Sequence, residues 1–336
     1  MSVSNEQAFQ APPPPPMADA KPRGPRPTKL RPFAIGFAVL GVLVAIGGAL
    51  KFIPGGITTG LALGFLGVLL FVLSFIPLPL VSDPQTPLSF VQKITGIFFE
   101  PSRVFRNLRD HPHWVGAFIL IVVLTLLYSF AFVRRITPER IVDHTTQKLS
   151  EMGPPFAPQP EQLERIKTDQ LQALKNPVER AGGFVKSAVG AFVLLCITAA
   201  ISLLGVLVFG GRINFWQALA INAFALVPIV VIQKLLGLVI LYLKAPEDLH
   251  PILNQETTLQ DNLGILLSPA EHPILFVLAS FIGLTWFYLI WLRAKGFHMG
   301  ATRVSSGVAW GVAITLWVLL LLFATVITAL FPGFIS

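Results

Sequence analysis

The side chains able to do chemistry inside the apolar part of this sequence are one lysine and a few amides. Lys234 stands in an otherwise uncharged stretch together with Gln217, Asn222 and Gln233. An ionisable group inside a membrane either serves a transport pathway or reaches back to the surface on a long side chain. Lys234 lies near the end of its stretch, so we expect it to reach the surface and the amides to form interhelical hydrogen bonds. The alternative is a solute path lined by Gln217, Asn222 and Lys234.

A second set of candidate residues is basic and precedes an uncharged run. Segment 88–113 mixes apolar residues with four cations, which are Lys93, Arg103, Arg106 and Arg109. Pro101 interrupts the segment, so two short amphipathic helices are expected. Basic amphipathic helices lie in the plane of the membrane interface, where their cations meet lipid phosphates. We therefore expect these four side chains to contact anionic headgroups.

Catalytic signatures are missing from the sequence. It contains no phosphate-binding GxxxxGK[ST], no HExxH, no CxxC and no GxSxG. The long apolar runs also contain no aspartate or glutamate, although ion-coupled carriers usually need such groups inside the membrane. The sequence therefore favours a protein that is not an enzyme and that needs no cofactor and no metal.

The composition indicates a membrane protein. Of 336 residues, 54% are hydrophobic and only 12% are charged, whereas a soluble domain has about 25% charged residues. The net charge is +8, but the basic residues stand beside the apolar runs, where they orient a membrane protein and meet anionic lipid. Nucleic acid is therefore not an expected partner, and no recognition motif points to it.

Seven apolar runs are long enough to cross a membrane as helices, because twenty helical residues rise about 30 Å, the thickness of the hydrocarbon core. The runs are 33–50, 57–80, 114–133, 187–209, 213–232, 273–291 and 304–330. We expect an all-α membrane protein with seven transmembrane helices. Apolar residues continue after the fifth run, so 213–243 is either one long helix or two pieces.

Proline-rich stretches divide the chain. Residues 1–31 form a basic, proline-rich tail that we expect to be disordered, and 32–81 form a two-span transmembrane hairpin. Gly56, Gly60 and Gly64 recur every four residues on one helical face of this hairpin. Small residues at that spacing let another helix approach closely. The face is therefore expected to pack within the bundle or against a second copy of the chain.

The longest hydrophilic segment, 134–186, is expected to form a small helical cap outside the membrane. The distribution of lysine and arginine places the N-terminus in the cytoplasm and the C-terminus outside. Arg134 and Arg135 abut the membrane on the outer side and count against this orientation.

Several segments resemble those of a known family. The opening segment 94–108 contains Gly-Ile and a proline followed by aromatic residues, and Pro-His-Trp at 112–114 opens the next helix. Two further segments, 215–219 and 224–228, read Phe-Trp-Gln-Ala-Leu and Phe-Ala-Leu-Val-Pro. Together with the polar insert, they resemble the YIP (Ypt-interacting protein) membrane domain in its bacterial form.

The resemblance implies a five-span membrane domain over 88–332, with the hairpin as an addition, in a bacterial cytoplasmic (inner) membrane. Eukaryotic members are implied to bind prenylated Rab-type GTPases, but the opening segment here looks bacterial and does not carry that role over. We expect a membrane scaffold that binds anionic lipid and either a protein partner or a second copy of itself. The alternative is a small-solute transporter or channel.

Overall fold

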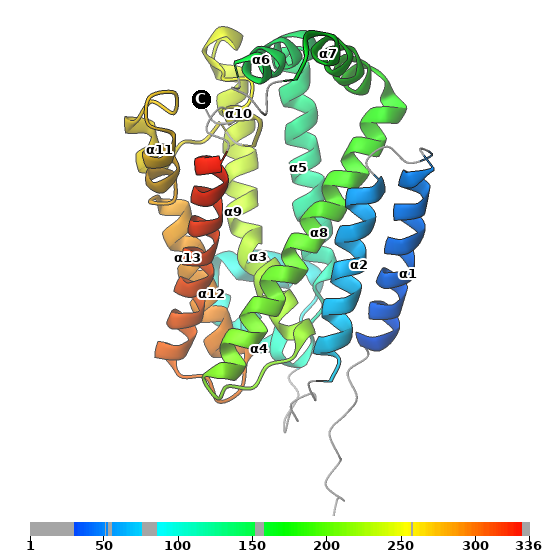
Figure 1. Cartoon of the computed structure of the whole chain (residues 1–336). Coiled ribbons are helices and arrows are strands. Elements are labelled where there is room, and N and C mark those ends of the chain that lie inside the picture. Colours follow the sequence, from blue (N-terminus) through cyan, green and yellow to red (C-terminus); the bar gives the residue numbers. More distant parts are fainter. Residues whose placement is uncertain are drawn as a thin grey trace, which may run out of the picture.

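The structure is a computed structural model in which all the named regular elements are helices (Figure 1). It describes residues 30–50, 52, 56–75, 86–151, 158–256 and 258–330. The predicted all-α architecture is confirmed over these residues. Nearly all of the basic tail predicted over 1–31 lies outside them, and so does the end of the predicted hairpin segment 32–81.

Six helices of the described chain are long and apolar enough to cross a membrane. They are α1 (Leu30–Ala49), α2 (Gly56–Leu73), α5 (Val115–Ile136), α8 (Pro177–Val208), α9 (Phe215–Leu243) and α13 (Ser306–Leu330). Each one corresponds to a run predicted from the sequence. Helix length and composition therefore give six membrane spans, and the predicted count of seven is not confirmed.

The remaining predicted span, 273–291, is broken into α11 (Pro273–Ser280) and α12 (Leu284–Gly300). Asp261, in the loop before α11, caps the first turn of α12. The carboxylate of Asp261 accepts hydrogen bonds from the Thr285 amide, at 2.7 Å, and from the Thr285 hydroxyl. Figure 1 shows that α11 and α12 together return the chain from the end of the bundle where α9 finishes to the end where α13 begins.

Helices α8 and α9 are longer than a membrane requires. The stretch 213–243, for which one helix or two was expected, forms the single 29-residue helix α9, with Pro228 inside it. Helix α8 has 32 residues and begins within the segment predicted as a polar insert. At about 1.5 Å per residue, α8 extends about 48 Å and α9 about 43 Å, so both are longer than a 30 Å hydrocarbon core.

The hairpin packs against one side of the bundle. Helices α1 and α2 lie along each other, and α2 contacts α8 (Figure 1). Aromatic rings add to this contact, because Phe37 lies 5.7 Å from Phe192 and Phe33 lies 5.3 Å from Trp216, measured between ring centroids. The contact holds the hairpin to α8 and to the first turn of α9.

Polar helices cover one end of the bundle (Figure 1). Most of the hydrophilic insert forms α6 (Pro138–Ser150), α7 (Pro160–Lys175) and the start of α8. Short elements follow α9, and these are η1 (Pro246–Asp248), α10 (Leu253–Glu256) and η2 (Leu263–Leu266). Two more helices, α3 (Phe90–Phe99) and α4 (Pro101–Asp110), contact α9 at the opposite end of the bundle (Figure 1).

Candidate functional site

Helix α4 uses its apolar face to pack against protein. Ser89 caps the preceding helix α3 in a capping box, and Pro101 occupies the first turn of α4. Phe105 of α4 is fully buried. Its ring packs so closely on Gly296 of α12 that a Cβ added to this glycine would lie only 3.1 Å from the ring. The sequence predicts that both short helices lie in the plane of the membrane interface. The apolar face of α4 packs on protein there, because Gly296 of α12 leaves room for Phe105.

Helix α3 buries a lysine beside Ile97 and exposes large apolar side chains. Val91 and Phe99 are 66% and 85% exposed, whereas Lys93 is only 3% exposed. The Lys93 ammonium points into the protein and donates a hydrogen bond to the His111 carbonyl at 3.3 Å. The prediction that Lys93 contacts lipid phosphate is therefore wrong. Exposed apolar side chains opposite a buried lysine are typical of a helix whose outer surroundings are nonpolar.

The three predicted arginines of α4 differ in exposure. Arg103 and Arg106 are exposed, and Arg109 is partly buried. Arg103 forms an ion pair with Glu100 at 3.1 Å, but both side chains are about 60% exposed, so the pair contributes little stability. The Nε of Arg109 lies 3.0 Å from the carboxylate of Asp110. Lipid contact stays a prediction for these arginines, with Arg103 and Arg106 the better placed.

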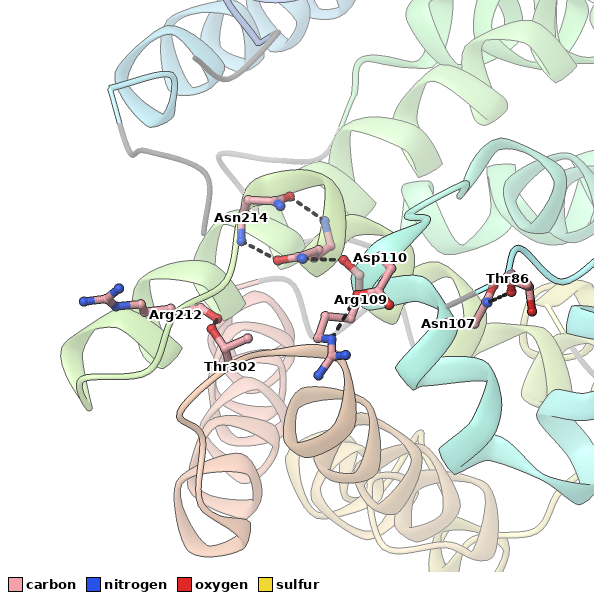
Figure 2. A network of polar contacts seen from close by, with 8 residues as sticks. Thr86, Asn107, Arg109, Asp110, Arg212, Asn214 and Thr302 are labelled. Atoms are coloured by element: carbon pink, nitrogen blue, oxygen red, sulfur yellow. Dashed lines mark hydrogen bonds and ion pairs between the residues drawn. The ribbon is translucent and has the colours of Figure 1, made fainter. Parts of the chain in front are cut away.

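A polar network ties the end of α4 to the start of α9 (Figure 2). The Gln217 side chain donates to the Arg109 carbonyl at 2.6 Å. Gln217 and Asn214 also exchange two hydrogen bonds, of 2.9 and 3.0 Å, as the capping box of α9. Asn107 anchors the segment before α3 through the Thr86 carbonyl at 2.8 Å. Gln217 is therefore engaged in capping α9 and in tethering it to α4.

The other two residues of the predicted path lie deeper in the bundle. Asn222 is fully buried and donates to the Ser202 hydroxyl at 3.0 Å, which is an interhelical hydrogen bond between α9 and α8. Lys234 is only 5% exposed, and its ammonium lies 4.7 Å from the centre of the Tyr128 ring of α5. The expectation that Lys234 reaches the surface is wrong, because α9 continues past it to Leu243 and α5 packs beside it.

The chain that follows α9 folds back over Lys234. The Tyr128 hydroxyl donates to the Asn254 carbonyl at 2.6 Å. The Thr258 hydroxyl donates to the Gly237 carbonyl at 2.7 Å. These two contacts hold the connection between α9 and α11 against α5 and α9.

Two of the predicted glycines lie where α1 and α2 touch. A Cβ on Gly60 would be 2.4 Å from the Ala45 nitrogen, and Gly56 is similarly close to α1. Gly64 differs, because a Cβ built on it would meet nothing within 4 Å. Its backbone is still part of the contact, since a Cβ on Gly41 would be 2.4 Å from the Gly64 nitrogen. Gly56 and Gly60 therefore allow backbone contact within the hairpin.

Comparison with known proteins identifies the larger part of the bundle. The family model of the Yip1 domain matches residues 95–327. The chain belongs to the Yip1 domain family. The predicted family is therefore confirmed, and the match begins within α3 and ends within α13, leaving α1 and α2 outside this Yip1 domain. With its long apolar helices, this Yip1 family member is a multi-pass integral membrane protein. Neither a curated protein nor a solved structure matches the chain.

Sequence reasoning missed a pair of histidines in the polar cap. The rings of His144 in α6 and His250 after η1 lie 4.9 Å apart and nearly perpendicular. Both border a cavity of about 740 Å³ between α6 and residues 247–251. The sequence carries no signal for this pair, because the two histidines are far apart in the chain and belong to no motif.

The buried arginine of α12 was also missed. Arg293 is only 3% exposed, and its Nε and Nη1 atoms have no hydrogen-bond partner among the described residues. The predicted span ended at residue 291 and left Arg293 in a turn. The structure continues the helix to Gly300 and places this guanidinium inside the bundle.

Proposed function

We propose that this Yip1 family protein is a non-enzymatic membrane scaffold that embeds α3 in one leaflet and engages anionic lipid through α4. The observation that carries the proposal is that α3 exposes large apolar side chains while its lysine is buried. Val91 and Phe99 face outward while Lys93 is turned inward. Burying a valine or phenylalanine side chain away from water is worth roughly 1.5–3 kcal/mol. An acyl-chain environment would supply that burial for both residues.

The exposed arginines of α4 add charge next to this apolar surface. Arg103 and Arg106 follow Phe99 by only one and two helical turns in sequence. A cation beside an anionic membrane surface contributes about 1 kcal/mol. The combination of inserted apolar side chains and flanking arginines fits a phospholipid interface better than a solvated protein face.

We infer that α3 and α4 lie at the cytoplasmic leaflet of a bacterial inner membrane, with the N-terminus inside and the C-terminus outside. Arg212 pairs through its backbone with Thr302 (Figure 2). Thr302 follows α12, whose last residue, Gly300, packs against the Phe105 carbonyl of α4, so Arg212 and Arg303 belong to the same end of the bundle as α4. An excess of basic residues at one end of the bundle supports a cytoplasmic position for that end.

The transporter alternative has less support. Gln217 is engaged in the cap of α9 and in a bond to the Arg109 carbonyl, and Asn222 bonds to Ser202. Two of the three residues expected along a solute path thus have structural hydrogen bonds. If the protein were a transporter, Lys234→Ala would abolish flux into liposomes while leaving the fold intact.

The lipid part of the proposal can be tested by native mass spectrometry of protein released from bilayers of phosphatidylcholine and phosphatidylglycerol. The double variant Arg103→Gln with Arg106→Gln is expected to weaken phosphatidylglycerol retention up to ~30-fold, at about 1 kcal/mol per charge. Arg165→Gln is the matched control, because Arg165 is an exposed arginine on α7 in the polar cap. Unchanged retention in the double variant would contradict the proposal.

The partner part needs a separate experiment. Extraction of the wild-type protein in native lipid particles keeps its neighbours bound. A second protein at fixed stoichiometry, or a second copy of the chain, is the expected result for a scaffold. Monomeric particles that contain lipid alone would remove the partner from the proposal.

A further inference from the structure

The segment that follows α9 is held against the polar cap by hydrogen bonds to its backbone. Arg140 of α6 donates to the carbonyls of Glu247, at 3.1 Å, and Leu249, at 3.2 Å, and also to that of Pro246. Leu249 is fully buried in a small apolar cluster with Tyr128 and other residues of α5, α6 and α9. The segment 249–255 therefore begins at a fixed point on α6.

His250 organises the rest of this segment. Its Nδ1 atom accepts hydrogen bonds from the amides of Ile252, at 3.2 Å, and Leu253, at 3.1 Å. Its own amide donates to the Asn254 side chain at 2.7 Å. A ring nitrogen accepts a hydrogen bond only when it carries no proton, and both nitrogens of a charged imidazole are donors. Protonation of His250 would therefore break two of the bonds that start α10.

The surroundings of His250 disfavour its charged form. The His144 ring lies 4.9 Å away, and the nearby cations belong to α6. Charged and titratable groups surround the two rings on three elements. Helix α6 contributes Arg140, Asp143, His144 and Lys148, with Glu151 directly after it; η1 contributes Glu247 and Asp248; and α7 contributes Lys167, which pairs with Asp143. Burial, together with His144, Lys148 and Arg140, lowers the pKa of His250 to about 4. Burial likewise lowers the pKa of His144, with Lys148 and Arg140 adding to the effect.

We propose that His250 is a pH-dependent latch: the neutral ring holds segment 249–255 closed against Tyr128, the residue that contacts Lys234, and the protonated ring releases the segment. The segment contacts Tyr128 through Asn254, whose carbonyl accepts a hydrogen bond from the Tyr128 hydroxyl at 2.6 Å. Tyr128 in turn covers the Lys234 ammonium. This device is independent of lipid binding by α3 and α4, which belong to a different part of the bundle.

The direction of the pH effect follows from the lowered pKa of His250. The pKa of His250 is lower in the folded protein than the ordinary value of 6.5. A group with a depressed pKa stabilises the closed segment above its ordinary pKa, and this stabilisation is lost as the pH falls through the folded value. The latch is therefore closed at neutral pH and opens as the pH falls through about 4.

Hydrogen exchange of the full-length protein in lipid nanodiscs tests the latch. The matched variant is His250→Asn, because asparagine keeps a neutral acceptor at this position and does not titrate. At pH 7 the amides of 249–255 are expected to exchange equally in the wild type and the variant. At pH 4 they are expected to exchange on the order of a hundredfold faster in the wild type, from the linkage between the two pKa values. Comparison at each pH removes the intrinsic pH dependence of exchange.

Two further variants keep the test decisive. His250→Ala lacks an acceptor and is expected to exchange fast at both pH values. His272→Asn changes an exposed histidine in the same connection between α9 and α11 and is expected to behave like the wild type. Equal exchange in the wild type and His250→Asn at pH 4 would overturn the proposal. Loss of the pH effect in His272→Asn would also overturn it.

Discussion

The ammonium of Lys234 lies 4.7 Å from the centre of the Tyr128 ring, between two helices that contain no acidic residue. A desolvated cation over an aromatic face is stabilised by roughly 2 kcal/mol. The hydroxyl of the same Tyr128 side chain donates a hydrogen bond to the Asn254 carbonyl in segment 249–255. The Tyr128 ring is therefore one of the groups that make a buried lysine tolerable in α9.

Substitutions at Tyr128 should separate the contribution of its ring to stability from that of its hydroxyl. Tyr128→Phe keeps the ring over Lys234 and loses the bond to Asn254, so we expect a loss of about 1 kcal/mol in unfolding free energy. Tyr128→Leu also removes the cation–π contact and should cost about 2 kcal/mol more. Chemical unfolding in detergent measures both values. Adding Lys234→Met to Tyr128→Leu should recover part of the loss, and equal stabilities of the Phe and Leu variants would refute the argument.

The contact between α1 and α2 gives a second prediction. A Cβ on Gly60 would lie 2.4 Å from the backbone of α1, whereas one on Gly64 would meet nothing within 4 Å. Gly60→Ala should therefore force the two helices apart and cost about 1–3 kcal/mol. Gly64→Ala is the matched control and should leave stability unchanged or slightly higher, because alanine favours a helix. Thermal unfolding of the two variants in the same detergent compares them, and the argument fails if both lose stability equally.

Gln217 gives a third prediction, which distinguishes a cap from a solute path. Gln217→Leu loses the bond that the Asn214 amide donates to the Gln217 side chain and the bond from that side chain to the Arg109 carbonyl. We expect a loss of about 1–2 kcal/mol of stability, as for other helix caps. Gln233→Leu, on the same helix but only partly buried, should cost less. A Gln217→Leu variant with unchanged stability but altered solute flux would instead support a path.

The sequence predicts the membrane helices well because hydropathy is a local property. Uncharged runs near twenty residues long correspond to α1, α2, α5, α8, α9 and α13. The break within 273–291 was not predictable in this way. It depends on Asp261, which lies outside the run and caps Thr285 only after the loop has folded back. Hydropathy averages over the run and does not register a cap supplied by a distant residue.

The direction of single side chains was the least predictable property. Lys93 and Lys234 were both expected at a surface, because a charge normally avoids the interior. Each is buried by neighbours that are remote in sequence, Lys93 against the His111 carbonyl and Lys234 against Tyr128. The same reason explains why the contact between His144 and His250 was missed. These features depend on tertiary packing, which one sequence does not encode in any local pattern.

Arg293 of α12 leads to the last prediction. Its side chain is 3% exposed, and neither Nε nor Nη1 has a hydrogen-bond partner among the described residues. A buried charge costs free energy through its lost hydration, and even a buried ion pair is often replaced by apolar side chains of similar volume with no loss or with a gain of about 1–4 kcal/mol. We therefore expect Arg293→Met to raise the unfolding temperature in detergent. Lys295→Met, two residues away and partly exposed, should change stability by less than about 0.5 kcal/mol. A lower unfolding temperature for Arg293→Met would mean that the guanidinium has an anionic partner, such as a lipid phosphate, and a further unfolding series with and without phosphatidylglycerol would identify it.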